Sequence, residues 1–337
     1  MKGYFLLATF CIINLFIACN SSSNKDKITL HGVTMGTTYS IIYLKNKGEN
    51  YQVQIDSILR KFNLTFSTYI DSSLISKFNQ SDSFVTINDW FKEVMETSKL
   101  VFDQTKGAFN PAVMPLVNAW GFGYAKKMNI DSAQVDSLLQ IIDFNKVNII
   151  GDKLIKEDFR IQLDFSAIAK GYGVDVIAAF LEDKGIQNYM VEIGGEVSTK
   201  GINEKNEVWK IGIDKPLKNK IDKRKLQAIV QLKDKAMATS GNYRNYYEKN
   251  NKRYVHTINP VTGYPSPSDL LSASVIAKNC MLADAYATAF MVMGYEKSVY
   301  FVEKDQSLEA YYIYLHENEI LTSSHLNENS NSILKEL

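Results

Sequence analysis

The chain lacks an excess of charge of either sign, with 38 lysines and arginines against 37 aspartates and glutamates. A nucleic-acid-binding surface needs a basic face, so this balance argues against a nucleic-acid partner. The patterns G-x-G-x-x-G and G-x-x-x-x-G-K-[ST] are absent, which weighs against Rossmann and P-loop nucleotide sites. Because cysteines are few and the histidines are scattered, a zinc site is unsupported as well.

Cysteine is scarce, and two of the 3 cysteines lie within the opening stretch MKGYFLLATFCIINLFIAC. A lysine followed by an apolar run too short for a membrane span predicts an export signal. The ending FIAC resembles a bacterial lipobox, so we expect cleavage before Cys19 and its lipidation rather than an uncleaved anchor or an ordinary signal peptide. The exported chain then keeps Cys280 alone, which excludes an internal disulfide and leaves stability to the core.

The polar stretch after Cys19, NSSSNKDK, is typical of a flexible tether, and residues 30 to 320 contain no convincing linker. We therefore expect a signal peptide at 1–18, a lipidated tether at 19–29, one large domain at 30–322 and a loosely held polar tail at 323–337. The hydrophobic content of 45% is ordinary for a globular domain.

Helical and strand patterns alternate irregularly along the domain, which favours an α+β fold over a doubly wound sheet. Residues 31–44 predict a strand broken near Gly36, and residues 51–69 and 90–107 have largely helical apolar spacing. Residues 108–123, with two prolines, predict a structured loop. Further strands are expected at 189–201, turning at Gly194 and Gly195, at 209–216, and as an aromatic-rich pair within 243–260.

The segment LDFSAIAKGYGVD, residues 163–175, places Lys170 in the first turn of an expected helix that Ser166 can cap. The free N–H groups of that turn are already positive, so a lysine there is unfavourable unless an anion lies between them. A phosphate is the usual anion for this geometry. The alternative is that the lysine extends outward into water.

Asp284 is the only charged residue in NCMLADAYATAFMVMG, residues 279–294. An unpaired buried carboxylate is costly, so it should face a cation, a donor network or the surface. Thr288 lies one turn later on the same face, and two such oxygens suit Mg²⁺ or Ca²⁺. The alternative is an acidic residue near a helix start that compensates the dipole.

His256 lies in the aromatic-rich region 237–265, before an Asn-Pro turn. Histidine is the side chain best able to exchange protons near neutral pH, although a lone strand histidine is more often structural. Ser240 and His256 suggest a serine hydrolase only weakly, because the chain has no G-x-S-x-G elbow and no evident orienting acid.

Eight segments, in this order, resemble the ApbE family, the FAD:protein FMN transferases of bacterial envelopes. Any one of them alone is weak, but the series spans nearly the whole exported chain. They are GVTMGTTYSI, STYIDSSLISKFN, GAFNPAVMPLVNAWGFG, LDFSAIAKGYGVD, VEIGGEV, ATSGNYRNYY, HTINPVTGYP and ADAYATAFMVMG.

The resemblance implies a T-fold-like α+β domain that uses Mg²⁺ to move the FMN half of FAD onto a Ser or Thr hydroxyl of an acceptor protein, with release of AMP. It implies His256 as the general base. It implies a metal site made by the carbonyl of Ala167 with Asp284 and Thr288. The residues implied to line the flavin-nucleotide site are Met35, Tyr69, Ala108, Phe109, Asn110, Asp164, Lys170 and Ile258. Asn110 stands where the family usually has Asp.

The resemblance also implies an acceptor flavoprotein of envelope redox complexes, with a target like D-x-x-[ST]-G-A-T, and a lipid-anchored enzyme at the periplasmic face of the envelope. Two other functions remain open on the sequence. Water in place of the acceptor hydroxyl gives an FAD pyrophosphatase that releases FMN and AMP. The second is a non-catalytic lipoprotein that binds flavin. His256 and Asp284 argue against it, because binding alone needs neither a base nor a buried acid.

Overall fold

A computed structural model describes most of the chain beyond the N-terminal 25 residues. The described residues are 26–45, 49–123, 130–216, 225–242, 246–249, 252–255, 257–265, 269–317, 319–326 and 333–337. The expected signal peptide and Cys19 therefore lie outside the described residues, as does His256. Among the described residues, no helix combines the length and apolar character needed to cross a bilayer.

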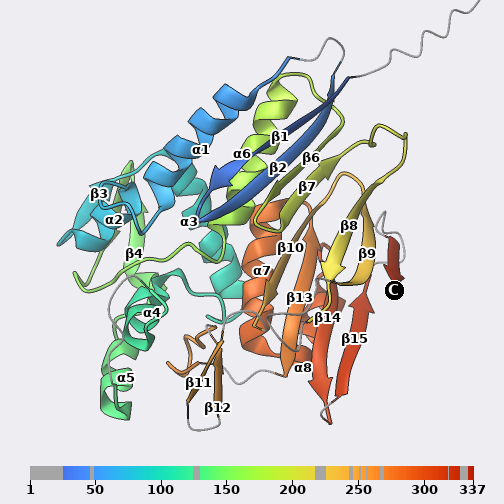
Figure 1. Cartoon of the computed structure of the whole chain (residues 1–337). Coiled ribbons are helices and arrows are strands. Elements are labelled where there is room, and N and C mark those ends of the chain that lie inside the picture. Colours follow the sequence, from blue (N-terminus) through green and yellow to red (C-terminus); the bar gives the residue numbers. More distant parts are fainter. Residues whose placement is uncertain are drawn as a thin grey trace, which may run out of the picture.

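A sheet of eight antiparallel strands forms the centre of the fold, in the order β1-β2-β6-β7-β10-β13-β14-β15 (Figure 1). Its strands are β1 (Asp26–Thr34), β2 (Thr37–Lys45), β6 (Tyr189–Ile193), β7 (Glu196–Lys200), β10 (Ala236–Gly241), β13 (Leu270–Ala277), β14 (Glu309–His316) and β15 (Glu319–His325). Strand β13 is buried along its whole length, because both of its faces are covered.

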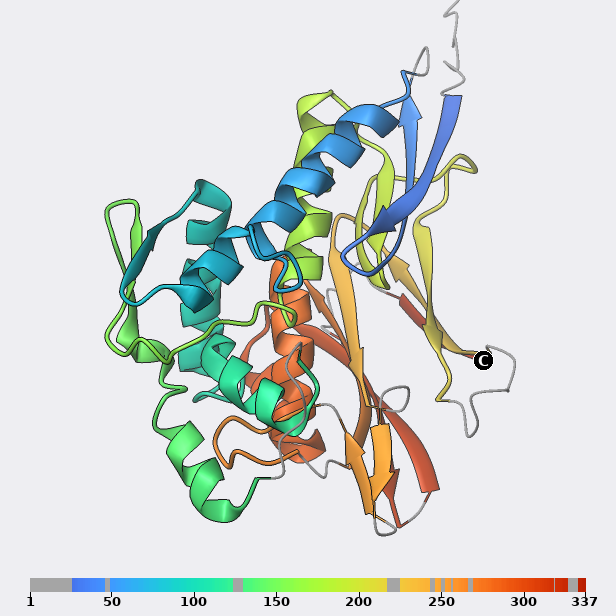
Figure 2. The same ribbon diagram turned by 60° about the vertical axis from the view of Figure 1, so that its left-hand side comes forward.

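Helices cover one face of this sheet, and Figure 2 shows them as a layer beside it. The helices that contact its strands are α1 (Gln52–Phe66), α6 (Ala169–Asp183), α7 (Cys280–Met293) and α8 (Tyr295–Lys304). An outer group packs on this layer and consists of α2 (Leu74–Gln80), α3 (Asp89–Gln104), α4 (Met114–Trp120), α5 (Ser132–Leu139), two 3₁₀ turns (Pro111–Val113 and Phe144–Lys146) and the small sheet of β3 (Phe84–Thr86), β5 (Lys153–Lys156) and β4 (Val147–Ile150). The largest apolar core fills the space between these helices and the sheet.

The opposite face of the sheet is covered by β8 (Trp209–Asp214), β9 (Leu226–Leu232) and β16 (Ile333–Glu336), which form a three-stranded sheet. A separate apolar cluster joins the two sheets. The alternation along β13 serves both cores, since Val275 belongs to the helix-side cluster and Ile276 to the sheet-side cluster. The central sheet is therefore the middle of three layers.

The α+β class expected from the sequence is confirmed, as are most of its elements. The hairpin turns at Met35 and Gly36, which both have positive φ, and a second hairpin turns at Gly194 and Gly195. The two long helical patterns form α1 and α3. The aromatic-rich pair forms β11 (Tyr246–Lys249) and β12 (Lys252–Val255).

Two local expectations are wrong. Residues 108–123 are not a loop throughout, because they contain a 3₁₀ turn and α4, and each has its proline in the first turn, where no helical N–H partner is lost. Ser166 does not cap α6, since Ile168 is the capping residue and makes no side-chain cap bond.

The sheet also extends further at both ends than expected. Strand β1 begins at Asp26, inside the expected tether, because its backbone pairs with β2 as far as Lys45. Parts of the expected loose tail also belong to sheets. Residues 323–325 form the end of β15, and β16 pairs with β9.

Candidate active site

A cavity of about 680 Å³ opens between the helical layer and the central sheet. Its wall combines the segment around Asn110, the first turn of α6, the β6–β7 turn, the end of β10 and one face of α7. This volume lies within the range of roughly 300–1,000 Å³ that is usual for small-molecule sites. The cavity therefore has room for a ligand of nucleotide size.

Helices α6 and α7 approach each other closely at the cavity wall, and glycine makes this possible. A Cβ atom on Gly171 would lie 2.3 Å from the carbonyl oxygen of Cys280 and 2.8 Å from Cβ of Asp284. On Gly173 it would lie 2.4 Å from Cε of Met35. Gly171 thus lets the first turn of α6 lie against the start of α7, and Gly173 leaves room for Met35.

The two helices also cap each other. The N–H of Gly171, in the first turn of α6, donates to Oδ2 of Asp284 at 2.9 Å. In return, the carboxylate of Asp175 on α6 accepts the N–H groups of Cys280 and Met281, each at 2.8 Å. N-terminal N–H groups have no partner within their own helix, so each carboxylate satisfies donors of the other helix. Burial raises the pKa of Asp175 to about 7, against the lowering effect of these two bonds.

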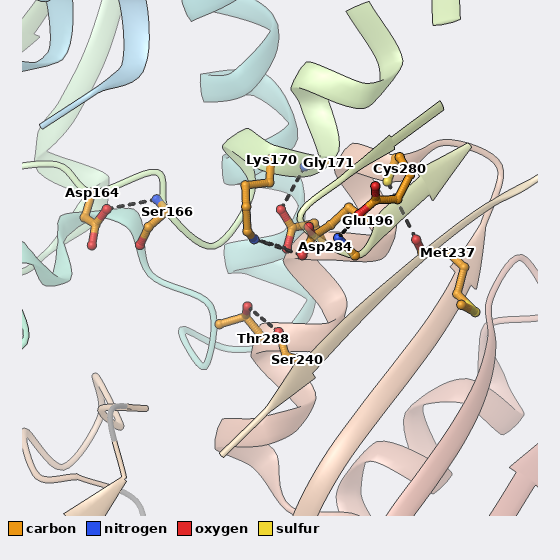
Figure 3. Close-up of polar contacts among 12 residues, drawn as sticks. Asp164, Ser166, Lys170, Gly171, Glu196, Met237, Ser240, Cys280, Asp284 and Thr288 are labelled. Atoms are coloured by element: carbon orange, nitrogen blue, oxygen red, sulfur yellow. Dashed lines mark hydrogen bonds and ion pairs between the residues drawn. The ribbon is translucent and has the colours of Figure 1, made fainter. Parts of the chain in front are cut away.

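Lys170 points toward two buried carboxylates, those of Glu196 and Asp284 (Figure 3). Its Nζ is 2.9 Å from Oε1 of Glu196 and 3.8 Å from Oδ1 of Asp284, and the two acidic side chains are only 4% and 3% exposed. Enclosure by itself lowers the pKa of Lys170, but the two carboxylates raise it above its usual value, so the ammonium keeps its charge. Burial raises the pKa of Glu196 to about 7, and Lys170 opposes that rise.

The expected metal-binding residues lie together on the cavity wall. Ala167 precedes α6, Asp284 is on α7, and Thr288 is one turn further along α7, where its hydroxyl bonds that of Ser240 at 3.1 Å. This set offers oxygen atoms alone, including one buried carboxylate, and such a set suits Mg²⁺. Among the described residues, no three or more His, Cys, Asp or Glu side chains form a cluster that could hold a metal ion.

The expected flavin-nucleotide residues Ala108, Phe109, Asn110, Asp164 and Ile258 also line the cavity. The backbone N–H of Asp164 donates to the carbonyl of Pro111 at 2.8 Å, which joins two cavity segments, and enclosure raises the pKa of its carboxyl.

Asn110 uses both ends of its side chain, since Oδ1 accepts from Ala112 and Nδ2 donates to the carbonyl of Ile142 at 2.8 Å. An aspartate could not make the second bond, so the amide here supports the local fold.

Two expected residues are not among those that line the cavity. Met35 packs beneath α6, and Tyr69 lies after α1 with 76% of its surface exposed. His256 lies outside the described residues, while its neighbours Thr257 and Ile258 line the cavity.

Sequence reasoning missed Glu196 and Asp175. A glutamate placed directly after a Gly-Gly turn, at the start of a strand, was the available signal for Glu196. Asp175 caps α7, which lies more than 100 residues later in the chain, so no local sequence pattern could predict this role.

The family model described as "ApbE family" matches residues 35–312. This match covers most of the chain and includes every described residue of the cavity wall. The chain belongs to the ApbE family. A curated ApbE-family relative from Vibrio cholerae serotype O1, named FAD:protein FMN transferase, is 38% identical and the alignment covers 88% of this chain and 90% of the relative. The relative of the same name from Escherichia coli K12 is 32% identical over 86% and 87%.

Solved ApbE structures have the same fold. The flavin transferase ApbE from Vibrio cholerae matches with a TM-score of 0.80 and 35% identity, covering 89% of this chain and 97% of that one. The apo form of the flavinyl transferase ApbE from Pseudomonas stutzeri matches with a TM-score of 0.80 and 31% identity, covering 89% and 95%.

Proposed function

We propose that this chain transfers the FMN half of FAD to a hydroxyl group of an acceptor protein and releases AMP. The single observation that carries the proposal is the cavity in which Lys170, at the first turn of α6, faces the space beside Asp284. A charged lysine that lines a cavity of nucleotide size suits a phosphate ligand. The relatives named FAD:protein FMN transferase support the choice of substrate.

The acceptor hydroxyl belongs to a Ser or Thr side chain in a target like D-x-x-[ST]-G-A-T. Its oxygen forms a new bond to the FMN phosphorus while the bridging P–O bond of the diphosphate breaks, and AMP leaves with that bridging oxygen. The product is a phosphoester. Phosphoryl transfer depends mainly on positioning and on charge neutralisation, which are what the cavity offers.

Each residue expected from the sequence then has a defined task. The carbonyl of Ala167 with Asp284 and Thr288 would hold Mg²⁺, which neutralises charge on the diphosphate when bound. Lys170 binds a phosphate oxygen. Ala108, Phe109, Asn110, Asp164 and Ile258 enclose the flavin nucleotide. His256 takes the proton from the acceptor hydroxyl as the hydroxyl attacks.

The test is to incubate the purified chain with FAD and MgCl₂, with and without an envelope flavoprotein that carries the target sequence. Intact-mass spectrometry should find the mass of FMN added to the acceptor and an equal amount of AMP. An acceptor whose target Ser or Thr is replaced by Ala is the matched control and should gain no mass. Release of free FMN and AMP with an unlabelled acceptor would identify an FAD pyrophosphatase instead, and binding without AMP release would identify a flavin carrier.

The place of action is part of the proposal. The N-terminal pattern supports a lipid anchor at Cys19 that holds the enzyme on the periplasmic side of the envelope. We expect Cys19→Ala to move the protein from the membrane fraction to the soluble fraction while transfer activity is kept, because the anchor is separate from the cavity residues. Fractionation followed by an activity assay measures both. A variant that still sediments with membranes would contradict lipidation at this cysteine.

A further inference from the structure

Glu196 is a buried carboxylate in the cavity wall that the proposed function leaves without a task. The residue is 3% exposed at the start of β7. Its Oε1 bonds Lys170, whereas its Oε2 is buried and has no hydrogen-bond partner among the described residues. A buried carboxylate with an unpaired oxygen is costly, so a packing role alone does not account for it.

The distances around Lys170 show what Glu196 does to it. The ammonium lies at hydrogen-bond distance from Glu196, at 2.9 Å, and beyond that distance from Asp284, at 3.8 Å. Asp284 is fixed on its other side by the N–H of Gly171. Lys170 and Gly171 are neighbours in one helical turn, so the Lys170 side chain starts close to Asp284. The hydrogen bond to Glu196 on β7 keeps its ammonium at the longer distance from Asp284.

We propose that Glu196 is a positioning residue that holds Lys170 away from Asp284, so that the Asp284 carboxylate remains available to a divalent cation and the ammonium remains available to a phosphate. This inference rests on the proposed function, since it assigns both ligands to the same cavity. Without Glu196, the ion pair between Lys170 and Asp284, now at 3.8 Å, shortens to hydrogen-bond distance. Each of them then competes with the ligand of the other.

The chain supplies a matched control in the pair Lys235–Glu309. Its Nζ–Oε1 distance is 2.5 Å, Glu309 is 1% exposed, and its Oε2 also has no hydrogen-bond partner in the described part of the chain. Neither residue lines the cavity. Replacing Glu309 therefore reproduces the loss of a buried glutamate from a lysine pair without touching the ligand site.

The first experiment measures Mn²⁺ binding by electron paramagnetic resonance, without FAD, for the wild type, Glu196→Gln and Glu309→Gln. We expect the dissociation constant of Glu196→Gln to rise about tenfold, the change produced by about 1.4 kcal/mol, and that of Glu309→Gln to stay unchanged. Circular dichroism checks the fold of each variant. Should Glu196→Gln fail to fold, Glu196→Asp keeps the charge but is shorter by one methylene, so its contact with Lys170 weakens. The Mn²⁺ dissociation constant of this variant should then rise by less than tenfold, and an unchanged value would overturn the proposal.

A Lys170→Met background separates positioning from direct attraction. If Glu196 acts through Lys170, the effect of Glu196→Gln shrinks to less than about threefold once the lysine is gone, as a double-mutant cycle measures. An equal loss in both backgrounds means that Glu196 attracts the cation itself, and this result overturns the proposal. An unchanged Mn²⁺ affinity in Glu196→Gln overturns it as well.

The second experiment measures FAD binding in EDTA by flavin fluorescence and does not depend on a metal. We expect Glu196→Gln to bind FAD more weakly, and Glu196→Gln with Asp284→Asn to recover affinity, because the competing carboxylate is gone. If the wild type binds FAD but no Mn²⁺, the metal assignment fails and the FAD measurement decides the role of Glu196. If the wild type binds neither, the proposed function fails and the positioning role fails with it.

Discussion

This protein has two ion pairs in which a partly exposed lysine contacts a buried glutamate, and the two pairs differ in their position relative to the cavity. Lys170–Glu196 connects α6 to β7 at the cavity, and Lys235–Glu309 lies away from it. In both pairs the glutamate is almost fully buried and has an unpaired oxygen among the described residues. An unpaired buried oxygen therefore does not mark a functional site by itself.

The cavity pair differs because its lysine also faces Asp284, whose position is set by the crossing of α6 and α7. Salt bridges taken out of water contribute little net stability, so their value depends on what else they hold in place. At the cavity, the pair holds an ammonium beside an open space. The four predictions below test this difference, beginning with the largest expected effect.

Removing the carboxylate that faces the cavity lysine should have the largest effect. Asp284→Ala should reduce Mg²⁺-dependent transfer by on the order of 10⁴-fold or more, because several kcal/mol of charge stabilisation is lost. The rate is measured as FMN-labelled acceptor on a gel, and a thermal melt checks that the fold is kept. Transfer at the wild-type rate would contradict the metal assignment.

The second prediction compares Lys170 with His256. His256→Ala should slow transfer about 10²-fold to 10⁴-fold, the usual span for loss of a general base, and leave FAD affinity nearly unchanged. Lys170→Ala should weaken FAD binding as well as slow transfer, because its phosphate contact exists before and during the reaction. Flavin fluorescence gives the affinity and the labelled acceptor gives the rate. Loss of FAD affinity in proportion to rate in His256→Ala would identify that histidine as a ligand or a structural residue.

The third prediction breaks the other pair. Lys235→Ala leaves Glu309 buried without its lysine, and we expect the free energy of unfolding to fall by about 2 kcal/mol, less than for a fully buried pair because the Lys235 side chain is 26% exposed. FAD affinity should not change. Urea unfolding and flavin titration measure the two quantities. A change in FAD affinity without a change in stability would remove the distinction between the pairs.

The fourth prediction concerns the pH dependence of stability and Asp175, which caps α7 beside the cavity pair. Its pKa is raised from 3.8 to about 7 in the folded protein. Between these values the folded chain keeps a proton that the unfolded chain releases, so this group lowers stability as the pH rises. Asp175→Asn removes the effect, and its stability relative to the wild type should increase from pH 4 to pH 7, by at most about 1.4 kcal/mol per pH unit. Urea unfolding at several pH values provides the test, and a constant difference would contradict the raised pKa.

Local chemistry singled out two residues that line the cavity. The first-turn position of Lys170 and the isolation of Asp284 in an apolar helix are both visible in the sequence, and the structure brings the two to one cavity. The partner of Lys170 could not be predicted, because Glu196 is 26 residues away and reaches it only through the order of strands in the sheet. Strand order is set by packing over the whole domain, which a local pattern does not contain.

The local errors have local causes. The prolines of residues 108–123 suggested a loop, yet a proline in the first turn of a helix removes no helical hydrogen bond. Ser166 has the right residue type for a cap, but the helix begins three residues later, at Ala169, and Ile168 takes the capping position. Both errors came from residue preference without knowledge of neighbouring backbone geometry.

The reciprocal capping of α6 and α7 has a thermodynamic consequence for the two ligands. One helix carries Lys170 and the other carries Asp284, and neither first turn can move without breaking a bond to the other. If a cation at Asp284 and a phosphate at Lys170 are coupled through these bonds, linkage requires that each ligand changes the affinity of the other by the same factor. A cation that lowers the dissociation constant of FAD by a given factor would then have its own dissociation constant lowered by the same factor once FAD is bound.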